Sequence, residues 1–169
     1  MTLDRAQTQN VTVEDPALPE AARAPARHIR VLVNPASGEK GGISTNDAAE
    51  DEVAAIMLAH FPELGDDLVI TGSEEEAIAA TRDAVAEGYD VVVAAGGDGT
   101  VGAVACELLG TQTALGVLPL GSVMNVARML GIPRDLEEAA AIIAEGAVRV
   151  IDVGEAKGQI FFEGGSVGL

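Results

Sequence analysis

The segment from Val91 to Thr100 constrains the fold of this chain more than any other part of it. It reads Val-Val-Val-Ala-Ala-Gly-Gly-Asp-Gly-Thr, five small or β-branched apolar residues followed by three glycines around one aspartate. A continuous apolar run of this kind is typical of a strand buried on both faces, as in a parallel sheet covered by helices. Because a helical pattern follows from Val101 to Leu109, the segment predicts a strand, a tight glycine turn and a helix.

A turn with this composition favours phosphate binding. Glycine has no Cβ, so the turn can adopt positive φ and let a ligand approach the backbone closely. The N-terminus of the following helix offers free N–H groups and the positive end of the helix dipole. Asp98 would repel a phosphate unless a cation accompanied it, so its presence indicates Mg²⁺. The segment is neither a Walker A loop nor a Gly-x-Gly-x-x-Gly turn, and a glycine turn without a ligand is the plainer alternative.

Composition narrows the class of protein. The 169 residues suit one domain, and 48% hydrophobic residues with only 2% aromatics predict a core of Val, Ile, Leu and Ala. The net charge of −17, with Lys40 and Lys157 as the two lysines, argues against nucleic acid and against electrostatic binding to anionic lipid. Cys106, the single cysteine, is expected to be a buried structural thiol. Without a secretory segment or a long apolar run, we expect a cytoplasmic protein.

Strand and helix patterns alternate from Ile29 onward, which predicts an α/β fold with a parallel-rich sheet flanked by helices. Residues 1–28 lack periodicity and are expected to form a disordered extension, with one domain over residues 29–169. The expected strands are Ile29–Val33, Leu68–Thr71, Val91–Ala95, Ala114–Leu118, Val148–Val153 and Gln159–Phe162, the last two as a hairpin. The expected helices are Asp47–Phe61, the segment from Ser73 to Glu87 with a capping box, Val101–Leu109, Val123–Leu130 and Leu136–Glu145.

Four loops with small hydroxyl, amide or glycine residues follow the expected strands. They are Asn34–Gly38, Thr71–Ser73, Gly96–Thr100 and Gly121–Ser122. Ligands of parallel α/β sheets bind at the carboxyl ends of the strands, where these loops should meet. We therefore expect a nucleotide cleft at that edge of the sheet.

Several sequence blocks occur in a characteristic order. They are Val33-Asn34-Pro35-Ala36-Ser37-Gly38, Thr71 before Glu76-Ala77, Gly96-Gly97-Asp98-Gly99-Thr100, Gly116-Val117-Leu118-Pro119-Leu120-Gly121-Ser122, Ala127-Arg128, Gly131-Ile132-Pro133 and Ile151-Asp152-Val153-Gly154. Together they resemble the catalytic domain of the diacylglycerol kinase and sphingosine kinase family, including bacterial lipid kinases. Gly-Gly-Asp-Gly-Thr alone is shared with NAD kinases, whereas the Asn-Pro-x-Ser-Gly and Pro-Leu-Gly-Ser blocks are more specific to lipid kinases.

The resemblance implies a diacylglycerol kinase-like nucleotide-binding domain that transfers the γ-phosphate of ATP, with Mg²⁺, to a lipid hydroxyl. Asp98 is the catalytic candidate, in a metal-binding or orienting role rather than as a general base, and the metal ligands stay unassigned. The implied ATP-site residues are Asn34, Ser37, Thr71, Gly96, Gly97, Asp98, Gly99, Thr100 and Ser122.

The chain also departs from the family pattern. Gly102 and Ala103 stand where the family usually has Asn and Glu, and Met124 stands where Asn is common. Asn125 comes one place later, a shift that turns a side chain by about 100° around a helix. The family's second, mostly β domain would begin about where this sequence stops, so we expect the chain alone to be poorly active or inactive.

Alternative functions stay open at this stage. They are an NAD kinase-like enzyme and a nucleotide-binding domain that has lost catalysis. The expected partners are ATP and a lipid of undetermined identity, without nucleic acid. Transient peripheral contact with a membrane surface and association into a homo-oligomer both stay open.

Overall fold

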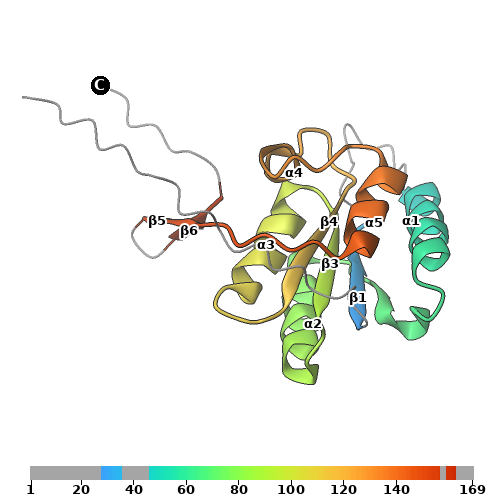
Figure 1. The fold of residues 1–169 in the computed structure, drawn as a ribbon, viewed down its shortest axis with the longest axis horizontal. Coiled ribbons are helices and arrows are strands. Elements are labelled where there is room, and N and C mark those ends of the chain that lie inside the picture. The colour runs from blue at the N-terminus through green and yellow to red at the C-terminus, as the bar shows by residue number, and fades with distance from the viewer. Residues whose placement is uncertain (1–27, 36–45, 157–158, 163–169) are drawn as a thin grey trace, which may run out of the picture.

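The computed structural model describes residues 28–35, 46–156 and 159–162. The predicted N-terminal extension, apart from its last residue, and Ser37 lie outside these residues. A four-stranded parallel sheet in the order β2-β1-β3-β4 forms the centre of the fold (Figure 1). Its strands are β1 (Ile29–Val33), β2 (Leu68–Ile70), β3 (Val91–Gly96) and β4 (Ala114–Pro119). The predicted parallel-rich α/β sheet is confirmed.

The register brings the carboxyl ends of the strands to one edge of the sheet. Val33 lies opposite Ile70 on one side and Ala95 on the other, and Gly96 lies opposite Pro119. Each strand therefore ends level with its neighbour, and the loops that follow the strands meet at this edge.

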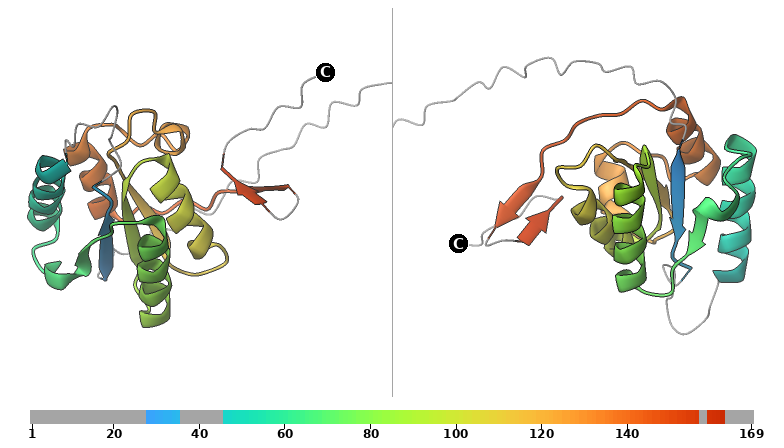
Figure 2. Two further views of the ribbon diagram at one scale, coloured as in Figure 1. Left: turned by 180° about the vertical axis from the view of Figure 1, so that it is seen from behind. Right: turned by 90° about the horizontal axis from the view of Figure 1, so that it is seen from below.

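Helices cover both faces of the sheet. Helices α2 (Glu74–Glu87) and α3 (Asp98–Leu108) lie on one face, and α1 (Asn46–His60) and α5 (Leu136–Glu145) lie on the other (Figures 1 and 2). The shorter elements are the 3₁₀ helix η1 (Gly65–Asp67) and the one-turn helix α4 (Asn125–Met129).

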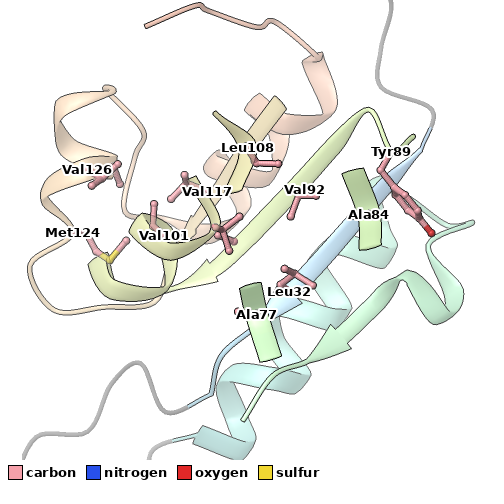
Figure 3. Packing of buried hydrophobic residues seen from close by; sticks show 13 residues of the cluster. Leu32, Ala77, Ala84, Tyr89, Val92, Val101, Leu108, Val117, Met124 and Val126 are labelled. Atoms are coloured by element: carbon pink, nitrogen blue, oxygen red, sulfur yellow. The ribbon is translucent and has the colours of Figure 1, made fainter. Parts of the chain in front are cut away.

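Alternation along the strands divides the core into two apolar clusters. Leu32, Val92 and Val117 pack toward α2 and α3 (Figure 3), in a cluster that also contains Met124 and Val126. Neighbouring strand residues such as Val31, Val93 and Leu118 belong to the second cluster, with α1 and α5. Because both faces are covered, all six residues of β3 are buried, as its continuous apolar run predicts.

The ends of α2 follow the predicted signals. The Ser73 hydroxyl accepts the Glu76 N–H at 3.2 Å, and Gly88 ends the helix in the left-handed conformation. The Glu76 carboxylate accepts the N–H of Gly72, at 2.7 Å, one residue before the position expected in a capping box.

Two predictions about the α3 region are wrong. The helix begins at Asp98 with Gly97 as N-cap, so the glycine segment is its first turn, and among the described glycines the positive φ values fall elsewhere. Cys106 is exposed, because Val101, Val104, Ala105 and Leu108 form the buried stripe of α3 and Cys106 lies outside it. Desolvation, with smaller contributions from Glu107 and Glu74, raises the pKa of its thiol.

The predicted strand Val148–Val153 is also wrong. That segment pairs with no strand among the described residues, and the Val150 side chain is 76% exposed. The second predicted strand is confirmed as β6 (Gln159–Phe161), but its antiparallel partner is β5 (Gly154–Ala156), and this hairpin lies outside the layer of α2 and α3 (Figure 2). Gly154 pairs with Phe161, and a Cβ on Gly154 would lie 2.1 Å from the ring Cζ atom, so the Phe161 ring fits there only against glycine.

We expect Gly116→Ala to lower the free energy of unfolding by about 1–3 kcal/mol, because the added methyl overpacks the core. Its Cβ would lie 2.9 Å from Val93 Cγ2 and 3.3 Å from Ile143 Cδ1. The matched control is Gly102→Ala on α3, where a Cβ meets nothing within 4 Å. That change should stabilise by about 0.5–1 kcal/mol through helix propensity. Urea unfolding of both variants is the measurement, and equal effects of the two would contradict the packing described.

Candidate active site

The loops after β1, β3 and β4 are tied together where the strands end. The Asn34 N–H donates to the Ala95 carbonyl at 2.9 Å, and the Leu120 N–H donates to the Gly96 carbonyl at 3.1 Å. The Thr71 N–H donates to the Val33 carbonyl at 2.8 Å, which adds the loop after β2. The convergence of loops predicted from the sequence is therefore present for the described residues.

The glycine segment Gly96–Thr100 forms the middle of this edge. Gly96 is buried, and a Cβ on it would lie 2.7 Å from Thr100 Cβ, so the turn closes only with glycine there. Asn34 Nδ2 donates to Thr100 Oγ1 at 3.0 Å, which joins the end of β1 to the first turn of α3. The N-terminus of this eleven-residue helix presents backbone N–H groups that have no partner within the helix.

The loop after β4 lies directly against the glycine segment. A Cβ on Gly121 would lie 2.8 Å from the Cα of Gly97 and 2.7 Å from the sulfur of Met124. The backbones of the two loops are therefore in contact, and a side chain at Gly121 would separate them.

Asp98 links the two loops through its side chain. Its Oδ1 accepts the N–H of Val126 at 3.2 Å, in the first turn of α4. The Asp98 carboxylate therefore has a structural role as the cap of α4. The sequence did not reveal this role. Magnesium at phosphate sites is usually held by one or two carboxylates plus the phosphates. The described residues contain no cluster of three His, Cys, Asp or Glu, and Asp98 fits the single-carboxylate arrangement.

Met124 holds the start of α4 in a strained backbone conformation. Its φ of 54° is the single positive value among described residues other than glycine, and its side chain is buried. Its sulfur accepts a hydrogen bond from the Gly121 N–H at 3.2 Å, and this bond connects the two ends of the loop between β4 and α4. Asn125, the candidate substitute for the family's asparagine, instead accepts a bond from Arg128 Nη2 at 2.7 Å through its Oδ1.

The remaining candidate residues lie at the same edge in different settings. Thr71 is 1% exposed and its hydroxyl donates to the Val33 carbonyl at 3.2 Å, so this hydroxyl contacts backbone. Ser122 is exposed, and its carbonyl accepts from Arg134. The structure thus brings together Asn34, the glycine segment and the Gly121–Ser122 loop.

Sequence reasoning missed a cleft beside this edge, and with it Arg134. The cleft has a volume of about 350 Å³ and opens next to the Gly121–Ser122 loop. Its lining residues are Val123, Met124, Ala127, Arg128, Gly131, Ile132, Pro133 and Arg134. The walls are mainly apolar and include no carboxylate, so this cleft provides no general base.

A second group of ionisable residues lies at the opposite edge of the sheet. Arg30 Nη2 donates to the Tyr89 hydroxyl at 2.7 Å, and that hydroxyl donates to Asp67. Burial, followed by the bond to Asp67, raises the pKa of Tyr89. Because Arg30 and Tyr89 are at the amino ends of β1 and β3, this group stabilises the far side of the sheet and takes no part in the site.

Comparison with known proteins agrees with this geometry. Residues 28–156 match the family described as "Diacylglycerol kinase catalytic domain". A diacylglycerol kinase of Bacillus subtilis is 34% identical over 140 residues, which are 80% of this chain and 44% of that protein. A probable lipid kinase, YegS-like, of Pseudomonas aeruginosa is 39% identical over 119 residues, 68% of this chain and 38% of that protein.

The solved structures lead to the same class. A diacylglycerol kinase from Bacillus anthracis superposes with a TM-score of 0.67 at 26% identity, over 82% of this chain and 49% of that one. The fold agrees with that of the diacylglycerol kinases among the solved structures. The chain belongs to the diacylglycerol kinase catalytic domain family and spans about half the length of the relatives it matches. No helix in the described ranges is long and apolar enough to cross a membrane.

We expect Asp98→Ala to lower the free energy of unfolding by about 1–2 kcal/mol, because the partly buried N–H of Val126 loses its acceptor. Asp98→Asn retains an acceptor oxygen and should cost less than half as much. Thermal unfolding in the absence of nucleotide measures both. If the two variants had equal free energies of unfolding, the hydrogen bond between Asp98 and Val126 would make no contribution to stability.

Proposed function

We propose that this chain forms the ATP-binding part of a lipid kinase that transfers the γ-phosphate of ATP to the hydroxyl of diacylglycerol or a related lipid. The observation that supports this most strongly is the contact between Gly97 and Gly121 at the carboxyl edge of the sheet. It closes two loops around the N-terminus of α3, and membership of the diacylglycerol kinase family supplies the reaction type.

In this proposal the chain's residues act mainly by positioning. The N–H groups of the first turn of α3 would bind phosphate oxygens, and Asn34 would hold Thr100 in place through the bond between their side chains. Asp98 would face the Mg²⁺ that accompanies ATP while it caps α4. When bound, Mg²⁺ would neutralise charge on the phosphates. Positioning and charge neutralisation supply most of the catalysis in phosphoryl transfer.

We expect the chain to bind Mg²⁺–ATP weakly, and Gly97→Val and Asp98→Ala to abolish the binding. Gly97→Val places a branched side chain where phosphate must approach the backbone. Asp98→Asn is the sharper second variant, because it removes the charge and keeps an acceptor for Val126. Isothermal titration calorimetry is the measurement.

Gly102→Ala is the control for this experiment, since it alters α3 two residues beyond the glycine segment, where a Cβ meets nothing within 4 Å. It should bind ATP like the wild type. Unchanged affinity in the folded Gly97→Val and Asp98→Asn variants would refute the proposed site.

We expect the 169-residue chain by itself to phosphorylate lipids poorly, at least about 100-fold below the Bacillus subtilis relative assayed beside it. General acid–base help contributes typically about 10²–10⁴-fold, and the cleft beside α4 has no carboxylate to provide it. Transfer of label from γ-labelled ATP to extracted lipids is the test, with NAD as a second acceptor. Robust lipid turnover that is lost in Asp98→Asn would place the acceptor machinery within these residues. Transfer to NAD would support the NAD kinase alternative.

A further inference from the structure

The Arg134 side chain hydrogen-bonds to the backbone of the loop that follows β4. Its Nη2 donates to the Gly121 carbonyl at 2.9 Å and its Nη1 donates to the Ser122 carbonyl at 3.0 Å. Arg134 itself lies between α4 and α5, directly before Asp135, the N-cap of α5. The two bonds therefore connect the start of α5 to a loop at the candidate site.

Arg134 binds backbone carbonyls and no recorded carboxylate among the described residues, although the chain is acidic. The sequence has 27 Asp and Glu against 10 Lys and Arg. Arg30 and Arg82 pair with Glu87 and Glu107, whereas Arg134 is exposed and has no carboxylate partner recorded among the described residues. A planar guanidinium fits two neighbouring acceptors in a way that a lysine ammonium does not. Arg134 thus orients two peptide groups instead of neutralising a charge.

The orientation of these peptides has a consequence for the N–H groups. The described chain has no cis peptide bonds, and in a trans peptide the C=O and N–H point in opposite directions. The carbonyls of Gly121 and Ser122 face Arg134, so the N–H groups of Ser122 and Val123 face away from it. Neither N–H has a hydrogen-bond partner recorded among the described residues.

The other side of the loop is held as well. Gly121 contacts Gly97 of the glycine segment, and its N–H is taken up by the sulfur of Met124. The loop is therefore fixed between Arg134 on one side and the phosphate-binding candidate on the other. Two free N–H groups with a fixed direction, next to a helix N-terminus, make a suitable site for an anion.

We propose that Arg134 is a positioning residue, which turns the N–H groups of Ser122 and Val123 toward a phosphate of the bound nucleotide. This inference rests on the proposed function, since it concerns the same ATP site. It assigns to the loop after β4 a direct role through its backbone, and to Arg134 an indirect role through that backbone.

The test is a titration of the ¹⁵N-labelled chain with Mg²⁺–ATP, followed through the amide resonances of two regions. In the wild type the amides of Gly97 and Gly99 report on the glycine segment, and those of Ser122 and Val123 report on the loop after β4. We expect both regions to shift. In Arg134→Lys, which keeps the charge and loses the planar fork, the Ser122 and Val123 shifts should disappear. The affinity for ATP should fall at least about tenfold, comparable to the loss of one charge-assisted interaction.

Arg128→Lys is the matched control. Arg128 lines the same cleft and bonds to Asn125, without contacting the carbonyls of the loop. Its affinity should stay within about twofold of the wild type, because lysine keeps the positive charge and the Arg128 guanidinium orients no peptide group of the loop.

The outcomes separate the two proposals. If the glycine segment responds to ATP in the wild type and Ser122 and Val123 do not, the role of Arg134 is refuted and the proposed function stands. Equal affinities of Arg134→Lys and wild type, or equal losses in both lysine variants, also refute that role. If neither region responds in the wild type, the proposed function itself fails. The wild-type titration distinguishes these cases even if Arg134→Lys does not fold.

Discussion

Burial of β3 on all sides is the constraint on which the rest of the structure depends. The strand hydrogen-bonds to β1 on one edge and to β4 on the other, and helices cover both of its faces. A strand in this position accepts only small or β-branched apolar residues, and its carboxyl end must emerge between the loops of its neighbours. The glycine segment is therefore placed at the centre of the ligand edge by packing, before any ligand chemistry is considered.

Close approach of two backbones follows from this arrangement. Gly97 and Gly121 touch, and the carboxylate of Asp98 reaches across to the N–H of Val126. Asp98, the residue that we propose to face Mg²⁺, is thus also a helix cap, so we expect alanine at this position to change stability and ligand binding together. The asparagine variant separates the two effects, because it retains the acceptor and removes the charge.

Met124, at the start of α4, is one of the three positions at which the chain departs from the family pattern that it resembles. Met124 stands where the resemblance leads one to expect asparagine, and it takes a left-handed backbone conformation that asparagine adopts more easily. Its compensation is burial of the side chain and a bond from the Gly121 N–H to the sulfur. The Oδ1 atom of Asn125, one place later, accepts a hydrogen bond from Arg128, while Met124 is held by packing.

The sequence by itself determined the order of strands and helices, the parallel sheet and the position of the glycine segment, because hydrophobic periodicity and turn residues are local signals. It also indicated the convergence of Asn34 with the glycine segment, since parallel strands end at one edge. Only the tertiary structure decided that α3 begins at Asp98, that residues 148–153 form no strand and that Arg134 binds the loop after β4. These depend on contacts between residues distant in the chain: a strand needs a partner, and a guanidinium needs carbonyls that folding brings within reach.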